Sequence, residues 1–211
     1  MSKKKIFLLI FIIFFYSFEV IAKQLNNNVV ISIDNLIITE LDIKKEIIFL
    51  KVINKDQLSN NTEQFKKEII KGLIDRKIKE IETFFYKIEI SNKEVEENLY
   101  SYLEGIKITN ETLNSYFNKN EIESDYLKNI IRIDLKWSKL IRQIYGNRIN
   151  VNLTEVNKQF ENEKENVENV EKFKNQLIIT EQNKLLNKFA ATHLEKSKKK
   201  YLIKFLWEKK S

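Results

Sequence analysis

The segment from Asp125 to Gly146 constrains the fold more than any other stretch of the chain. A surface helix needs one apolar stripe, whereas this segment has two and leaves only a narrow polar edge. The stripes consist of Tyr126, Ile130, Ile133, Trp137, Leu140 and Ile144, and of Leu127, Ile131 and Leu135. We therefore predict a central helix that other elements surround. Ser124 or Asp125 is expected to cap its start, and Gly146 to end it in the left-handed conformation.

The composition favours long helices around this segment. The 211 residues include no proline and three glycines, which disfavours a sandwich or barrel built on many tight turns. With 43% hydrophobic and 32% charged residues, the chain can form a core beneath a highly charged surface. There is no cysteine, so disulfides, thiolate metal sites and cysteine nucleophiles are excluded.

The N-terminus has the three parts of a secretory signal peptide. Lys3–Lys5 form a basic start, Ile6–Phe15 form an uninterrupted apolar core, and Val20–Ala22 precede a cleavage position. A membrane-spanning helix needs about 20 apolar residues, and this core is shorter. Cleavage near Ala22 is therefore favoured over the alternative, an uncleaved anchor. We predict an exported protein whose mature chain begins near Lys23.

Both ends of the mature chain are rich in residues that favour β-strands. Val29–Ile33 and Leu36–Ile38 flank the dipeptide Asp34–Asn35, which is typical of a hairpin. A lone hairpin is only marginally stable in water. Tyr201–Trp207 supplies a third strand, so we predict one small sheet in which the two ends meet.

Between the two ends, the spacing of apolar residues and capping signals predicts a series of helices. The expected ranges are Thr39–Ile53, Thr62–Phe85, Ser91–Glu104, Thr109–Phe117, Asp125–Gly146, Thr154–Phe160 and Val170–Lys199. Capping boxes are expected at Thr39 and Ser91. Gly105 is expected to end the third helix, and Gly72 to let another helix approach closely. The predicted fold class is mainly α with a small β-sheet (α+β).

The order of these elements can be compared with known domains through a set of short segments. They are Val29–Val30 with the hairpin, Thr39–Asp42, Leu73–Ile78, Ile90–Val95, the central helix, Arg148–Val151, Thr154–Val156, Gln176–Ile178 and Tyr201–Ile203. Together they resemble the N-terminal domain of the SurA-type periplasmic chaperones. The resemblance implies a signal peptide (1–22) and a chaperone domain (23–211). Within that domain, a C-terminal helix and strand (170–207) would pack back on an N-terminal helical part (28–160).

One departure from this family concerns catalysis. Its members usually carry parvulin-type prolyl isomerase domains between the last two helices. The gap from Phe160 to Val170 cannot hold a domain of about 100 residues, and the chain has one histidine where a parvulin site needs more. No isomerase activity is therefore expected. The polar stretch Glu161–Asn169 is either an exposed helix or loop, or a flexible junction between two subdomains.

No group of residues points to an enzyme, a metal or a cofactor. The single histidine, His193, lies at the edge of an apolar stripe, which favours a packing role over metal binding or catalysis. The net charge of +7 is spread among many acids, so no nucleic-acid-binding face is expected. Lys196–Lys200 is expected to be a solvated helix end, and weak contact with anionic lipid or an acidic client is the alternative.

A chaperone has to leave aromatic surface open to its clients. The candidates are Phe84, Phe85, Tyr86, Tyr100, Tyr102, Tyr116, Phe117 and Tyr126. Any single one of them is more often a core residue, so a subset is expected to line the client-binding surface. We predict a periplasmic holdase for unfolded envelope proteins, and the resemblance implies outer-membrane proteins as clients. The alternative is a non-catalytic adaptor or scaffold that docks on one folded partner.

Overall fold

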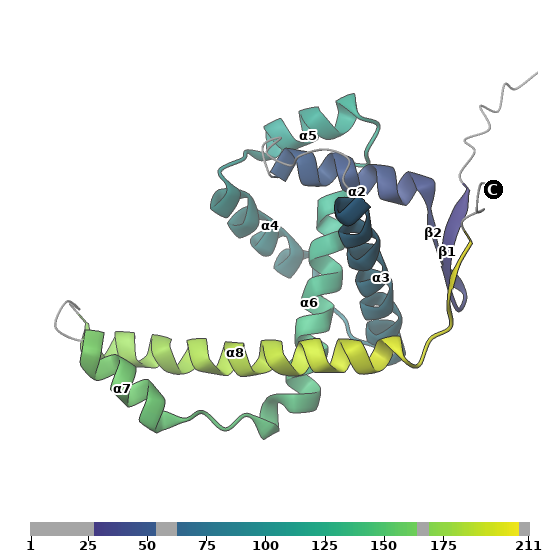
Figure 1. The fold of residues 1–211 in the computed structure, drawn as a ribbon. Helices are drawn as coiled ribbons and strands as arrows, with labels where there is room; N and C mark the ends of the chain where they lie inside the picture. Colours follow the sequence, from purple (N-terminus) through teal and green to yellow (C-terminus); the bar gives the residue numbers. More distant parts are fainter. Residues whose placement is uncertain (1–27, 54–62, 164–168, 207–211) are drawn as a thin grey trace, which may run out of the picture.

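A computed structural model describes residues 28–53, 63–163 and 169–206 of the chain (Figure 1). The elements are β1 (Val29–Ile33), β2 (Leu36–Thr39), α2 (Glu40–Ile53), α3 (Glu63–Phe85), α4 (Asn92–Ile106), α5 (Asn110–Lys119), α6 (Tyr126–Tyr145), the 3-10 helix η1 (Gly146–Arg148), α7 (Leu153–Glu163), α8 (Val170–Lys198) and β3 (Ile203–Phe205). The predicted class, mainly α with a small sheet, is confirmed. The predicted signal peptide and Trp207 lie outside the described residues.

The central helix α6 is surrounded as predicted. It packs against α3, α4 and α8, and it buries Leu127, Ile131, Leu140 and Ile141. Trp137 is only 5% exposed. Both predicted end signals are wrong, however. No side chain caps the start of α6, and Gly146 keeps a right-handed conformation because the chain continues directly into η1.

The three strands form the predicted sheet between the two ends of the chain. The strand order is β2-β1-β3, and both pairings are antiparallel. Asp34 turns the hairpin with a φ of 47°, and its carboxylate accepts a hydrogen bond from the Leu202 backbone at 2.9 Å. Ile31, Ile33 and Ile38 are fully buried, which fixes the register of the sheet over α3.

Three of the predicted helix starts, at Thr39, Ser91 and Thr109, are confirmed by side-chain caps. The Thr39 hydroxyl accepts from the Asp42 backbone at 3.2 Å, and the Asp42 carboxylate accepts from the Thr39 backbone at 2.8 Å. Ser91 and Glu94 form the same reciprocal pair at the start of α4, and Thr109 caps α5. These caps satisfy backbone donors that a helix cannot pair internally.

The predicted helix ends are less accurate. α4 passes through Gly105 and ends where Lys107 adopts the left-handed conformation, with a φ of 55°. Gly72 has nothing within 4 Å of its Cβ position, so the close approach that we expected there is wrong. The glycines therefore do not mark the special backbone positions of this chain.

The molecule has a compact body and a projecting arm (Figure 1). The arm consists of α7 and residues 170–180 of α8, which pack on each other around Val156, Phe160 and Leu177. The rest of α8 lies against α3 and α6, where Leu186 joins the cluster around Trp137. None of the helices in the described ranges is long and apolar enough to cross a membrane.

Candidate functional site

The predicted aromatic residues divide into exposed and enclosed groups. Phe84, Phe85, Tyr86 and Tyr100 are 84%, 75%, 40% and 81% exposed. Three others, Tyr102, Tyr116 and Tyr126, are half-buried, and Phe117 is fully buried. The inclusion of Phe117 in an open client-binding surface is therefore wrong.

Phe117 is enclosed because α5 and α6 pack on α2. Its ring lies 6.3 Å from the rings of both Phe49 and Tyr126. The Tyr126 hydroxyl donates to the Glu46 carboxylate at 2.6 Å, and Arg76 binds the same carboxylate at 2.8 Å. Burial, reinforced by the negative charge of Glu46, raises the pKa of Tyr126. Tyr126 therefore belongs to a buried polar cluster, with Glu46 and Arg76, that joins α2, α3 and α6.

The exposed residues Phe84, Phe85 and Tyr86 form a patch at the end of α3, which we call the α3 patch. The rings of Phe85 and Tyr86 meet edge-to-face at 5.3 Å. Next to them, Lys87 is left-handed, with a φ of 51°, and the Ile88 backbone N–H donates to the Thr83 carbonyl. This turn buries Ile88 in the core, whereas the neighbouring Phe84, Phe85 and Tyr86 stay exposed.

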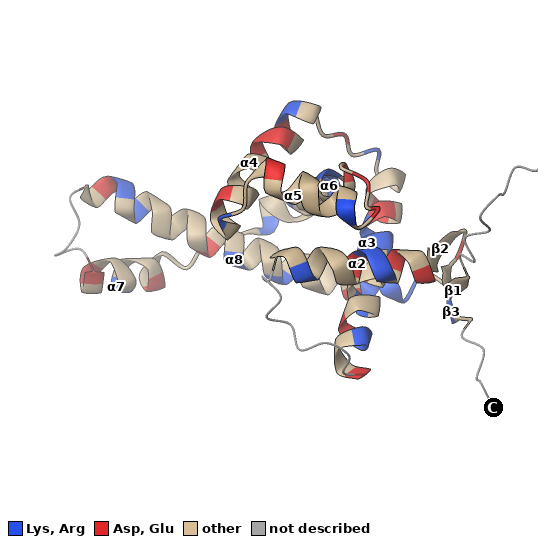
Figure 2. Cartoon of the chain, turned by 90° about the horizontal axis from the view of Figure 1, so that it is seen from above, with Lys and Arg blue, Asp and Glu red and all other residues tan. Residues whose placement is uncertain are grey.

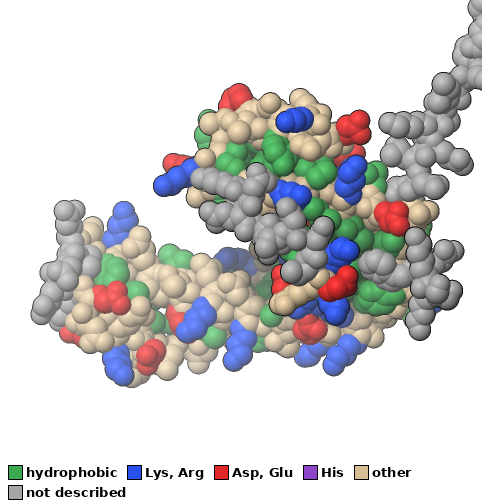
Figure 3. Space-filling model, turned by 45° about the horizontal axis from the view of Figure 1, so that its top comes forward, with side chains coloured by type: hydrophobic (Ala, Val, Ile, Leu, Met, Phe, Trp, Pro, Cys, Tyr) green, Lys and Arg blue, Asp and Glu red, His purple; other side chains and the backbone are tan. Residues whose placement is uncertain are grey.

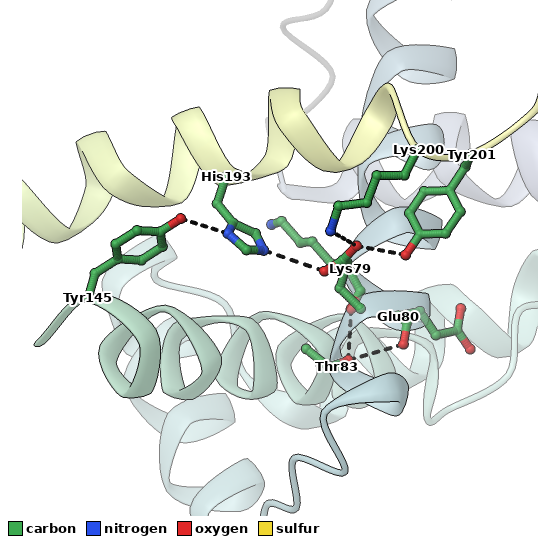
Figure 4. Close-up of polar contacts among 8 residues, drawn as sticks. Lys79, Glu80, Thr83, Tyr145, His193, Lys200 and Tyr201 are labelled. Atoms are coloured by element: carbon green, nitrogen blue, oxygen red, sulfur yellow. Dashed lines mark hydrogen bonds and ion pairs between the residues drawn. The ribbon is translucent and has the colours of Figure 1, made fainter.

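The last turns of α3 also carry a buried polar network (Figure 4). Glu82, one helical turn before Tyr86, is 2% exposed. Its carboxylate accepts from the Tyr201 hydroxyl at 2.7 Å and from Lys200 Nζ at 3.0 Å. His193 Nε2 lies 3.4 Å from the same carboxylate, and His193 Nδ1 lies 2.9 Å from the Tyr145 hydroxyl. These hydrogen bonds hold α8, and the segment that connects α8 to β3, against α3.

The protonation of this network follows from its geometry. A carboxylate only accepts hydrogen bonds, so Nε2 of His193 donates to Glu82. Burial opposes ionisation of Glu82, but hydrogen bonds from Tyr201, Lys200 and His193 outweigh it and lower the pKa of Glu82. No cluster that could hold a metal ion occurs in the described part of the chain. His193 is buried, and its ring lies edge-to-face with that of Trp137 at 5.4 Å.

A groove of about 710 Å³ lies between α3 and β3, and we call it the β3 groove. Its apolar lining is Ile70 and Ile74 from α3 and Ile203 and Phe205 from β3. The sequence did not predict it, because apolar spacing along a helix or strand does not distinguish a residue lining a groove from one in the core. The signal available was the strand alternation of Ile203 and Phe205, which places both side chains on the face of the sheet that meets α3.

Apolar side chains also reach the surface elsewhere. On the arm, Leu153, Val170 and Ile179 are each about half exposed, and Figure 3 shows hydrophobic side chains on the body and at the end of the arm. Lys and Arg alternate with Asp and Glu along the helices (Figure 2). The surface therefore carries several separate apolar patches, and positively and negatively charged side chains are interspersed around them.

No protein-family model matches the chain, and no curated protein matches it.

Proposed function

We propose that this protein is a chaperone that holds unfolded or extended polypeptides without catalysing prolyl isomerisation. The observation that carries the proposal is the α3 patch, where two consecutive phenylalanines are 84% and 75% exposed. A side chain of this kind gains about 2 kcal/mol when it is removed from water, so leaving two of them open favours a surface that binds apolar ligands.

The shape of the molecule also supports this proposal. The arm projects from the body and carries its own exposed apolar residues, Leu153, Val170 and Ile179. A long flexible client can contact several separated patches at once, and each weak contact raises the effective concentration of the next. Such binding is reversible, and it lowers the concentration of free, aggregation-prone client.

The cellular setting is part of the proposal and has a separate basis. The signal peptide pattern before Lys23 supports export, and the SurA-like order of elements supports the periplasm. Unfolded envelope proteins, including outer-membrane proteins, are the clients that we propose on that basis.

The first prediction concerns the α3 patch. In Phe84→Ser/Phe85→Ser, suppression of the aggregation of denatured clients should require about tenfold more protein, because the apolar area available to the client is lost. Both side chains are exposed, so the fold should be retained. Light scattering with several unrelated denatured proteins at near-stoichiometric ratios measures the effect.

Ile37→Ser on β2 is the matched control, since Ile37 is also exposed (48%) but lies outside the patch. It should suppress aggregation like the wild type. If the wild type, the double variant and Ile37→Ser suppress aggregation equally, the α3 patch does not bind clients. If the wild type protects no client, the chaperone function itself is wrong, and the adaptor that docks on one folded partner becomes the better explanation.

A further inference from the structure

The sheet of this protein ends in an open edge at β3. No described strand pairs with the outer side of β3. On the inner side, the Leu206 backbone N–H donates to the Val30 carbonyl at 2.8 Å, so Leu206 and Lys204 direct their backbone groups to β1. Because backbone groups alternate along a strand, Ile203 and Phe205 direct their N–H and C=O groups to the open edge. Such an edge is a template for another strand.

The β3 groove lies where that additional strand would run. Its lining comes from α3, β3 and Lys198, and no residue of β1 or β2 contributes, so it lies on the open side of β3. Phe205 is 58% exposed because nothing in the described chain covers it there. Neighbouring strands lie about 4.8 Å apart, so an added strand would place alternate side chains over Ile70 and Ile74 of α3.

The charges at the groove select the kind of strand that fits. Lys198 is bound to Asp75 at 2.7 Å, and Lys66 lies 3.9 Å from Glu63. The remaining cations of the lining, Lys67 and Lys71, are exposed and form no ion pair within 4 Å among the described residues. An acidic side chain on the incoming strand would meet two exposed lysines that have no ion-pair partner within 4 Å among the described residues.

A second copy of this chain fits the groove poorly. The β3 segment of such a copy would bring Lys200 and Lys204 to an edge that is already basic. No acidic residue lies between these two lysines to offset their charge. Like charges placed opposite each other on paired strands destabilise the pairing.

We infer that the β3 edge binds an extended client segment as a fourth strand, and that it prefers segments that carry apolar and acidic residues on the same face, two positions apart. The apolar residues occupy the β3 groove, the acids pair with Lys67 and Lys71, and backbone hydrogen bonds to Ile203 and Phe205 hold the strand. This inference rests on the proposed function and specifies the chemical class of its clients.

The experiment measures binding of short fluorescent peptides by anisotropy, with the full mature chain. A peptide with Val and Glu taking turns at every second position and Thr at the positions between them places Val and Glu on one face, and it should bind about tenfold more tightly than its counterpart with Lys in place of Glu. Lys67→Glu/Lys71→Glu should remove that preference, whereas Lys188→Glu, an exposed lysine of α8 outside the groove, should keep it. Equal affinity of the wild type for both peptides would overturn the inference.

Two variants at one position separate the backbone contact from the side chain. Phe205→Ala removes the ring but keeps the outward N–H, whereas Phe205→Pro removes both and leaves the hydrogen bonds to β1 intact. The proline variant should bind the Val and Glu peptide about fivefold more weakly than the alanine variant, and circular dichroism should show both folded. Equal binding by the two variants would exclude strand addition.

The oligomeric state and the aggregation assay distinguish the remaining outcomes. A dimer that dissociates in Phe205→Pro would show that a second copy occupies the edge, and would overturn the inference. If the wild type suppresses aggregation but binds neither peptide, the edge inference is wrong and the chaperone proposal stands. If the wild type neither suppresses aggregation nor binds either peptide, the edge inference and the chaperone proposal are both wrong.

Discussion

Glu82 shows how one buried carboxylate connects distant parts of this chain. It lies on α3, and it binds Lys200 and Tyr201, which are 118 and 119 positions away in the sequence. A buried charge with several hydrogen bonds costs little when every partner is present and a great deal when one is removed. Glu82 therefore helps to attach the C-terminal segment, together with the pairing of β3 with β1 and the ion pair between Lys198 and Asp75.

At the residue scale, we predict that Glu82→Gln lowers the free energy of unfolding by about 2 kcal/mol at neutral pH, because Lys200 and His193 lose their anionic partner. Urea denaturation measures the change. Glu104→Gln, an exposed glutamate at the end of α4, is the control and should change stability by less than about 0.5 kcal/mol.

The same carboxylate predicts a pH dependence. The pKa of Glu82 is lower in the folded protein than its ordinary value of 4.5. The folded state therefore holds its proton more weakly than the unfolded state, and stability falls as the pH drops from 4.5 through the folded pKa. In Glu82→Gln this part of the acid dependence should be absent below about pH 5. An unchanged acid slope would contradict the assignment.

At the scale of single elements, three helices of the body end in the same unusual way. Lys87, Lys107 and Glu121 have φ values of 51°, 55° and 55° after α3, α4 and α5. In each case the following isoleucine donates its backbone N–H to the last turn, and Ile88 and Ile122 are buried. Burial of that isoleucine compensates for a left-handed conformation that costs a residue other than glycine about 1 kcal/mol.

We therefore predict that Lys107→Gly stabilises the protein by about 0.5–1 kcal/mol, because glycine adopts this conformation without steric cost. Lys93→Gly, in the first turn of the same helix, is the matched comparison and should destabilise it by about 0.5–1 kcal/mol. Thermal denaturation of the two variants measures the difference. A loss of stability in both would show that the end of α4 is not strained.

At the scale of the whole molecule, the arm and the body have separate cores. The arm is held by the cluster of Val156, Phe160 and Leu177, whereas Leu140 belongs to the cluster of the body around Trp137. Regions that share few buried contacts can open independently. The arm is therefore expected to unfold locally while the body stays folded.

Leu177→Ala should remove about 2–4 kcal/mol from the arm and leave the body intact. Hydrogen exchange should then become faster in Leu153–Glu163 of α7 and stay unchanged in α6. Leu140→Ala, with a fully buried side chain in the body, should speed exchange in α6 as well. Equal effects of the two substitutions on α6 would show that arm and body unfold together.

Much of the fold could be predicted from local patterns. The apolar stripes of α6, the capping boxes at Thr39 and Ser91, and the hairpin with its third strand were all identified correctly, because each depends on residues close in sequence or on simple periodicity. The helix ends at Lys107 and after Tyr145 were missed, because burial of a neighbouring isoleucine or continuation into η1 decided them.

The sequence by itself determined the helices, their starts and the meeting of the two chain ends, since backbone hydrogen bonding and side-chain spacing act locally. Only the tertiary structure decided which aromatic residues stay in solvent: Phe117 is fully buried and Phe84 is 84% exposed, although both lie near the ends of amphipathic helices. It also decided that the β3 edge faces an open groove. Exposure depends on which elements cover a residue, and that follows from how distant segments pack.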